Sequence, residues 1–102
     1  MQTAIASKRS EIISLCRQFH VSRLELFGSA VSDEFDPQRS DLDFLVEFEP
    51  LTAAAYAKAY FDFKEALERL SGRPVDLVVP SAIRNPYFRK SIEQSKALLY
   101  AA

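Results

Sequence analysis

The sequence predicts one α/β domain over residues 1–102, in which a small mixed β-sheet is flanked by helices. The chain has 102 residues, enough for one hydrophobic core and too few for a second. Hydrophobic residues make up 48% and charged residues 26%, which is typical of a globular protein and excludes a disordered or collagen-like chain. Helical and strand-like periodicities alternate along the chain, which is typical of an α/β fold.

The first quarter of the chain predicts a helix, a strand and a turn. Apolar residues recur at helical spacing over 3–19 and predict an amphipathic helix. Alternating apolar residues predict a strand over 23–27. Gly28 follows this strand directly, which indicates a tight turn into a short helix over about 29–33.

The middle of the chain predicts a loop, a second strand and a long helix. Residues 33–40 are polar and contain an Asp-Pro pair, which favours a loop. Residues 41–48 predict the strand. Thr52 is a suitable N-cap for a helix over 53–71, and Gly72 stands where a C-cap glycine is expected. We expect the buried stripe of this helix to comprise Tyr56, Tyr60, Phe63, Leu67 and Leu70.

The last quarter predicts a third strand and a further helix. Residues 74–79 form an apolar run interrupted by one acid, which predicts a strand that ends at Pro80. Pro86 is well placed to open a helix over 86–96. The tail over 97–100 is expected to be a short strand or a docked extension.

The cysteine content and the lack of targeting signals predict a cytoplasmic protein. Cys16 is the only cysteine, so the chain forms no internal disulfide and suits a reducing compartment. No apolar run approaches the roughly 20 residues that span a bilayer. The N-terminal residues lack the basic and apolar regions of a signal peptide. We therefore expect no membrane partner.

The charge is balanced overall but uneven along the chain. Thirteen Lys and Arg against 14 Asp and Glu give a net charge of −1, which argues against nucleic acid as a direct substrate. Residues 33–49 contain seven acids and one base, whereas residues 81–102 contain four bases and one acid. Two interpretations stay open: two solvated surfaces, or an acidic metal site with a basic segment near it.

Two aspartates on the second predicted strand are candidates for a metal site. Asp41 and Asp43 share one face of the strand, while Leu42, Phe44 and Val46 point into the core. Two carboxylates on one face repel each other unless a cation lies between them. Carboxylates with open coordination positions suit Mg²⁺, which also binds substrate phosphates.

A third aspartate and the Gly-Ser pair complete the candidate site. Asp76 lies within an apolar strand, where a charge is unfavourable unless it is paired or metal-bound. Gly28 allows the backbone to approach a ligand closely, and Ser29 adds a hydroxyl at the start of a helix. A phosphate-binding turn beside a carboxylate cluster is the arrangement that phosphoryl or nucleotidyl transfer requires.

Three segments of the chain resemble the minimal nucleotidyltransferases (MNT) of the DNA polymerase β-like superfamily, including the MntA-like antitoxins of HEPN/MNT toxin–antitoxin pairs. The resemblance covers nearly the whole chain and implies the nucleotidyltransferase fold. The segments are Leu26-Phe27-Gly28-Ser29, Ser40-Asp41-Leu42-Asp43-Phe44-Leu45-Val46 and Val75-Asp76-Leu77-Val78.

The resemblance also implies a role for each site residue. Asp41 and Asp43 would bind two Mg²⁺ ions. Asp76 would complete the catalytic metal site and help to deprotonate the acceptor hydroxyl. Gly28 and Ser29 would hold the triphosphate of ATP. Many family members carry a basic residue soon after Gly-Ser, and this chain has none over 30–38.

The resemblance further implies an acceptor on another protein, because the chain lacks the helical domain that larger nucleotidyltransferases use. In the implied reaction, the chain acts as an antitoxin that transfers AMP from ATP to a tyrosine of a HEPN-domain toxin. Two alternatives stay open. One is a catalytically degenerate antitoxin that neutralises its partner by binding, and the other is a small-molecule nucleotidyltransferase completed by a second subunit.

Overall fold

A computed structural model describes residues 3–28 and 41–102 of the chain. The predicted short helix over 29–33 and the predicted loop over 33–40 therefore lie outside the described residues. In chain order the elements are α1 (Thr3–Ser7), α2 (Arg9–Gln18), β1 (Val21–Phe27), β2 (Leu42–Phe48), α3 (Ala53–Ser71), β3 (Val75–Val78), the 3₁₀ turn η2 (Pro80–Ala82), α4 (Pro86–Ser95) and β4 (Ala97–Ala101).

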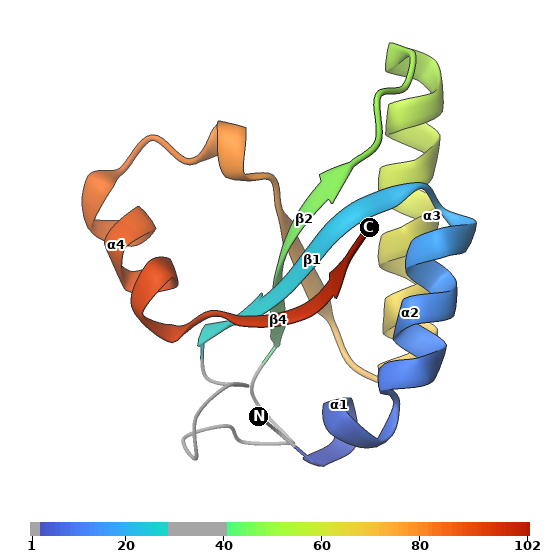
Figure 1. Cartoon of the computed structure of the whole chain (residues 1–102), viewed down its shortest axis with the longest axis horizontal. Coiled ribbons are helices and arrows are strands. Elements are labelled where there is room, and N and C mark those ends of the chain that lie inside the picture. The colour runs from blue at the N-terminus through green and yellow to red at the C-terminus, as the bar shows by residue number, and fades with distance from the viewer. Residues whose placement is uncertain (1–2, 29–40) are drawn as a thin grey trace.

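The strands form one mixed sheet in the order β3-β2-β1-β4. β1 is antiparallel to both β2 and β4, whereas β2 and β3 are parallel. Helices α2 and α3 cover one face of the sheet, and α4 lies on the opposite side (Figure 1). The predicted class, a small mixed sheet flanked by helices, is confirmed, and the tail over 97–100 is a strand.

The main core lies between the sheet and helices α2 and α3. Alternate residues of β2 point into it, as predicted, because successive side chains of a strand project to opposite faces. Leu42, Phe44 and Val46 are each at most 1% exposed. A smaller apolar cluster of Phe27, Leu45 and Ile92 fills the space beneath α4.

Helix α3 begins and ends where the sequence predicts. The Thr52 side chain accepts a hydrogen bond from the Ala55 N–H at 3.2 Å, which satisfies one free donor of the first turn. Gly72 ends the helix with a φ of +70°, which favours glycine. The Tyr60 hydroxyl donates to the Leu77 carbonyl at 2.6 Å and so links α3 to β3.

Part of the predicted buried stripe is only half-buried. Phe63 and Leu67 are buried, but Tyr56, Tyr60 and Leu70 are only partly covered. Tyr60 and Leu70 lie at the two margins of this stripe, and Tyr56 lies in the first turn of α3.

The single predicted helix over 3–19 is wrong, because the chain turns at Lys8 between α1 and α2. The Lys8 ammonium donates to the carbonyl of Leu70 at the end of α3, at 2.8 Å. This turn places Ile5 in the same core cluster as Ile12. Local periodicity therefore predicted the apolar residues but not the break, which depends on a contact with a distant helix.

Cys16 is fully buried, and burial raises the pKa of its thiol to about 12. It therefore stays a neutral core residue. No helix in the described parts of the chain is both long and apolar enough to cross a membrane.

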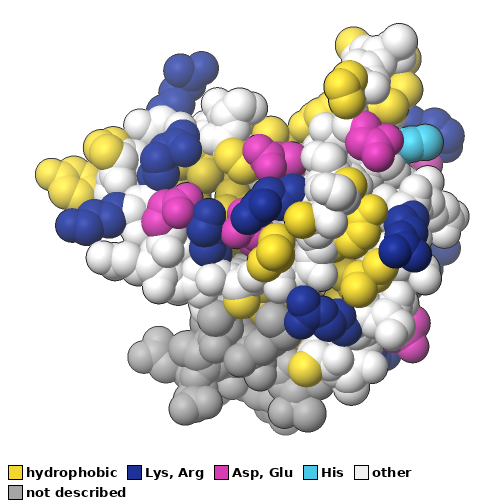
Figure 2. Space-filling view, viewed as in Figure 1, with side chains coloured by type: hydrophobic (Ala, Val, Ile, Leu, Met, Phe, Trp, Pro, Cys, Tyr) yellow, Lys and Arg dark blue, Asp and Glu magenta, His cyan; other side chains and the backbone are white. Residues whose placement is uncertain are grey.

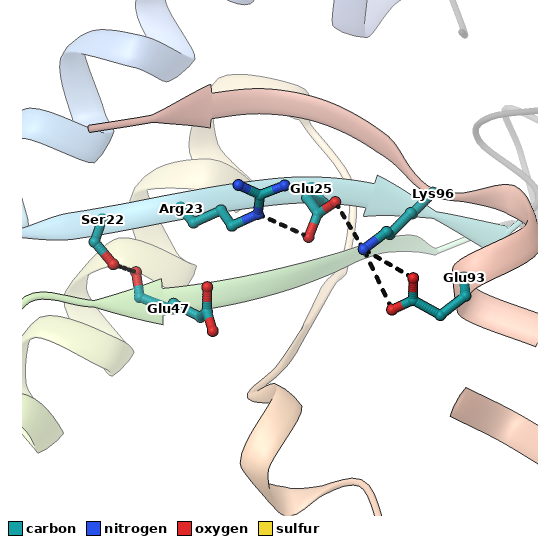
Figure 3. A network of polar contacts seen from close by, with 6 residues as sticks. All are labelled: Ser22, Arg23, Glu25, Glu47, Glu93 and Lys96. Atoms are coloured by element: carbon teal, nitrogen blue, oxygen red, sulfur yellow. Dashed lines mark hydrogen bonds and ion pairs between the residues drawn. The ribbon is translucent and has the colours of Figure 1, made fainter. Parts of the chain in front are cut away.

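A buried acidic side chain links α4 to the sheet (Figure 3). Glu25 on β1 is only 6% exposed. Its carboxylate accepts from the Arg23 Nε at 3.2 Å and pairs with the Lys96 ammonium at 3.3 Å. Lys96 also pairs with Glu93 of α4 at 3.1 Å. Because the Glu25 carboxylate is paired on both oxygens, its charge is tolerated in the interior.

Removing the Lys96 charge is expected to destabilise the fold. Lys96→Met leaves Glu25 with one cationic partner, so the free energy of unfolding should fall by about 1–2 kcal/mol. Lys90→Met removes an exposed ammonium from α4, the helix that Lys96 follows, and should change the free energy of unfolding by less than about 0.5 kcal/mol. Urea denaturation measures both. Equal effects of the two substitutions would contradict the role of the Glu25–Lys96 pair.

Candidate active site

The strand register brings two of the predicted aspartates side by side. Asp43 of β2 pairs with Asp76 of parallel β3, and it pairs with Phe27 of β1 on its other side. Residues opposite each other in register project to the same face of a sheet. Phe27 belongs to the cluster beneath α4, so both carboxylates lie on the α4 side. Asp41 directly precedes β2.

The three carboxylates interact electrostatically. Partial burial, followed by the negative charges of Asp76 and Asp41, raises the pKa of the Asp43 carboxyl from 3.8 to about 6. A like charge nearby disfavours ionisation, as does loss of hydration. Asp43 is half-buried, whereas Asp41 and Asp76 are exposed. Excess negative charge therefore concentrates around Asp43.

The predicted surroundings of Asp76 are wrong. The sequence indicates a charge within a buried strand, but β3 is an edge strand and the Asp76 side chain is exposed. No group of three or more Asp, Glu, His or Cys side chains over residues 3–28 and 41–102 is already gathered as a metal site. The charges of the three aspartates thus interact, but their side chains are not arranged as a preformed metal-coordination site.

Gly28 leaves the space next to the Asp43 carboxylate free. The glycine has a φ of +76°, and a Cβ added there would lie 2.8 Å from Asp43 Oδ2. A side chain at this position would therefore displace the carboxylate. The sequence predicts a close approach of Gly28 to a ligand, and the neighbour of Gly28 in the structure is the Asp43 side chain. Ser29, the other residue of the predicted phosphate-binding turn, lies outside the described residues.

The residues present fit a divalent cation. Carboxylate oxygens are the ligands that Mg²⁺ prefers. The repulsion that raises the pKa of Asp43 is relieved when a cation binds between the carboxylates. The side chains that would hold Mg²⁺ are Asp41, Asp43 and Asp76.

The predicted basic segment lies on the same side of the sheet. Figure 2 shows basic and acidic side chains interspersed around the hollow between α4 and the strands. A cavity of about 310 Å³ is present there, and Arg23, Glu25 and Lys96 contribute to its lining. Arg89 donates to the carbonyls of Pro80 and Ile83. Several of these cations are therefore engaged in structural contacts.

Two features of this side of the molecule were not predicted from the sequence. One is the buried Glu25 pair, which was signalled by an acid within the apolar strand residues 24–27. The other is the aromatic pair Tyr87 and Phe88 at the start of α4, which follows the N-cap Asn85. No local pattern in the sequence distinguishes these rings from core aromatics.

Comparison with known protein families shows to which family the chain belongs. Residues 9–99 match the family described as "Nucleotidyltransferase domain". This match spans most of the chain and includes Gly28 and the three aspartates. The chain belongs to this nucleotidyltransferase family. The expected enzyme class is thereby confirmed.

Curated relatives of this nucleotidyltransferase occur in Methanocaldococcus jannaschii. One, named a "putative protein adenylyltransferase", is 38% identical over 90 residues, which cover 88% of this chain and 86% of that protein. A second protein with the same description is 36% identical over 77 residues, which cover 76% of this chain and 75% of that protein. The chain thus spans most of the length of these relatives.

Solved structures share the fold of this nucleotidyltransferase. A "putative minimal nucleotidyltransferase" superposes with a TM-score of 0.71 at 31% identity, covering 95% of both chains. A toxin–antitoxin structure with AMP-PNP gives a TM-score of 0.68 at 21% identity, covering 92% of this chain and 73% of that chain. A tri-AMPylated Shewanella oneidensis HEPN toxin in complex with MNT antitoxin gives 0.58 at 20% identity, covering 95% and 72%. The last two similarities show the fold alone.

Replacing Asp43 by Asn is expected to stabilise the metal-free protein at high pH. The folded state holds the Asp43 proton up to about pH 6 and the unfolded chain only to about pH 4. Ionisation of Asp43 therefore lowers stability as the pH rises through this window. Asp43→Asn should raise the free energy of unfolding by about 1 kcal/mol at pH 8, after allowance for solvent screening.

Urea denaturation in the presence of a chelator measures this effect at two pH values. The gain from Asp43→Asn should disappear below about pH 4, where the wild-type carboxyl is protonated in both states. A gain of equal size at both pH values would show that the substitution acts through packing instead of charge.

Two glycine substitutions separate backbone strain from crowding of the site. Gly28→Ala and Gly72→Ala both place a Cβ at a φ near +70° and should each cost about 1 kcal/mol of stability. Only Gly28→Ala crowds Asp43, because nothing lies within 4 Å of a Cβ at Gly72. Calorimetry with Mg²⁺ and a non-hydrolysable ATP analogue should show weaker binding for Gly28→Ala alone. If both variants bind the ATP analogue equally well, Gly28 is not part of the nucleotide-binding site.

Proposed function

We propose that this chain is a Mg²⁺-dependent protein adenylyltransferase that transfers AMP from ATP to a tyrosine hydroxyl of a HEPN-domain toxin and acts as its antitoxin. The observation that carries the proposal is the half-buried Asp43 carboxylate, flanked by Asp76 and Asp41 and adjoining Gly28. Two of the sequence relatives are named as protein adenylyltransferases. Toxin–antitoxin complexes are among the proteins that share the fold.

The reaction joins the acceptor oxygen to the α-phosphorus of ATP. The bond from the α-phosphorus to the bridging oxygen breaks, pyrophosphate leaves, and the acceptor hydroxyl loses its proton. Bound Mg²⁺ would polarise the phosphate oxygens and offset the charge of the triphosphate. The protein must therefore position both reactants and provide a group near the hydroxyl that can accept the proton.

The two paired aspartates are suited to different tasks in this reaction. Asp43 is half-buried on the internal strand β2, and Gly28 adjoins its carboxylate. Asp76 is exposed on the edge strand β3, where the hydroxyl of a second protein can approach it. Asp41 and Asp43 would hold the metal ions at the triphosphate. Asp76 would complete the catalytic metal site, orient the acceptor hydroxyl and help to take up its proton.

Gly28 supports the same arrangement at the end of β1. Its missing side chain leaves the Asp43 carboxylate accessible. Ser29 would contribute its hydroxyl to the triphosphate, together with the backbone N–H groups that follow. The segment after Ser29 has no basic residue up to position 38, so the charge of the triphosphate would be offset mainly by the metal ions.

Replacing Asp43 tests whether the chain acts by catalysis. Purified HEPN partner is mixed with ATP, Mg²⁺ and either wild-type chain or Asp43→Asn. Intact-protein mass spectrometry should show the added mass of AMP on a partner tyrosine with the wild type, and at least a 100-fold slower addition with the variant. Glu47→Gln removes an exposed carboxylate from the same strand and should retain transfer.

Rescue of cells that express the toxin separates catalysis from neutralisation by binding. Loss of rescue and of AMP addition together, in a variant that stays folded, supports the proposal. Full rescue by Asp43→Asn, with no mass added by the wild type from any nucleoside triphosphate, would contradict it and leave an antitoxin that acts by occlusion.

A further inference from the structure

Helix α4 presents two aromatic side chains to solvent close to the candidate active site. Tyr87 is 83% exposed and Phe88 is 42% exposed. The Phe88 ring packs edge-on against Phe27, with the ring centroids 6.0 Å apart. Phe27 in turn lies opposite Asp43 in the strand register. The Phe27 side chain therefore lies between Phe88 and the site carboxylate, and Tyr87 directly precedes Phe88 in the first turn of α4.

The backbone that carries these two rings is held in place. The Asn85 side chain accepts hydrogen bonds from the N–H groups of Tyr87 at 2.9 Å and Phe88 at 3.3 Å. Pro86 restricts the first helical residue to a helical φ. Further along the helix, Ile92 packs in the apolar cluster with Phe27 and Leu45 of the sheet. The position of the backbone that carries the pair is thus set before any ligand binds.

The side chain of Tyr87 makes no stabilising contact found in the described parts of the chain. It takes part in none of the ring contacts found there, and its hydroxyl makes no hydrogen bond found there. An exposed aromatic ring beside a polar site offers a ligand both an apolar face and a polar hydroxyl. Planar nitrogenous bases stack on such rings with little dependence on hydrogen bonding.

We propose that Tyr87 and Phe88 form the stacking surface for the nucleobase of the nucleoside triphosphate. The inference rests on the proposed function, because that function brings a triphosphate to Asp43. With its phosphates at Asp43, the ligand extends its base past Phe27 toward the start of α4. Stacking uses the π face of the base, and this face is larger in a purine than in a pyrimidine. Purine triphosphates therefore bind more tightly than pyrimidine triphosphates.

Two probes with Mg²⁺ separate the base from the phosphates: a non-hydrolysable ATP analogue, and inorganic tripolyphosphate, which has no base. Isothermal calorimetry is carried out on the full chain. Tyr87→Ala should weaken binding of the ATP analogue about 10-fold and leave tripolyphosphate binding unchanged. Tyr87→Phe keeps the ring and should keep wild-type affinity.

Phe61→Ala is the matched control, because it removes a 65% exposed aromatic from α3, which covers the opposite face of the sheet (Figure 1). It should change the affinity for neither probe. Phe88→Ala, which also removes a contact with Phe27, should weaken binding of the ATP analogue more than that of tripolyphosphate.

Three results would overturn the inference. If Tyr87→Ala changes neither affinity, or weakens both probes equally, the ring does not stack on a base. If the variant binds the ATP analogue normally but modifies the partner more slowly, Tyr87 contacts the partner protein instead. If the wild-type chain binds neither probe, the proposed nucleotidyl transfer fails, and the stacking surface fails with it.

Discussion

The alternation of side chains along β2 is the constraint on which the rest of the structure depends. This strand pairs on both sides, with β1 and with β3. Its residues Leu42, Phe44 and Val46 must face the main core, so Asp43 must face the other way. A shift of one residue in register would bury the carboxylates and expose the core residues. The hydrophobic core thus determines on which face the candidate active site lies.

The position of each strand in the sheet gives the aspartates different surroundings. β2 is internal, and a half-buried carboxylate there loses part of its hydration and feels its neighbours strongly. β3 is an edge strand, so Asp76 stays in contact with solvent although it lies beside Asp43 in register. One half-buried and one exposed carboxylate suit the proposed reaction, in which the acceptor hydroxyl belongs to a second protein.

Helix α4 connects structural and functional features of the same face. Its Ile92 packs against Phe27, and the Lys96 that follows the helix pairs with the buried Glu25. These contacts fix the helix over the inner strands β1 and β2 while its first turn remains exposed. The Glu25–Lys96 ion pair helps to set the position of the helix. Its formation requires partial desolvation of both charges, a cost that an apolar contact would not have. The proposed stacking surface requires such a fixed helix.

Much of this protein is determined by the sequence alone, because its signals are local. The caps Thr52 and Gly72 define α3 to the residue, and the alternation in residues 42–46 predicts which side chains of β2 are buried. The Gly-Ser and aspartate motifs indicate the family, since the chemistry needs these residue types at this spacing. Other features depend on which elements become neighbours, which periodicity does not encode. The break at Lys8 follows from a contact with the end of α3, the exposure of Asp76 from the edge position of β3, and the burial of Glu25 from the packing of α4. Only the tertiary structure decides them, because each results from a contact between residues far apart in the chain or from the place of a strand in the sheet.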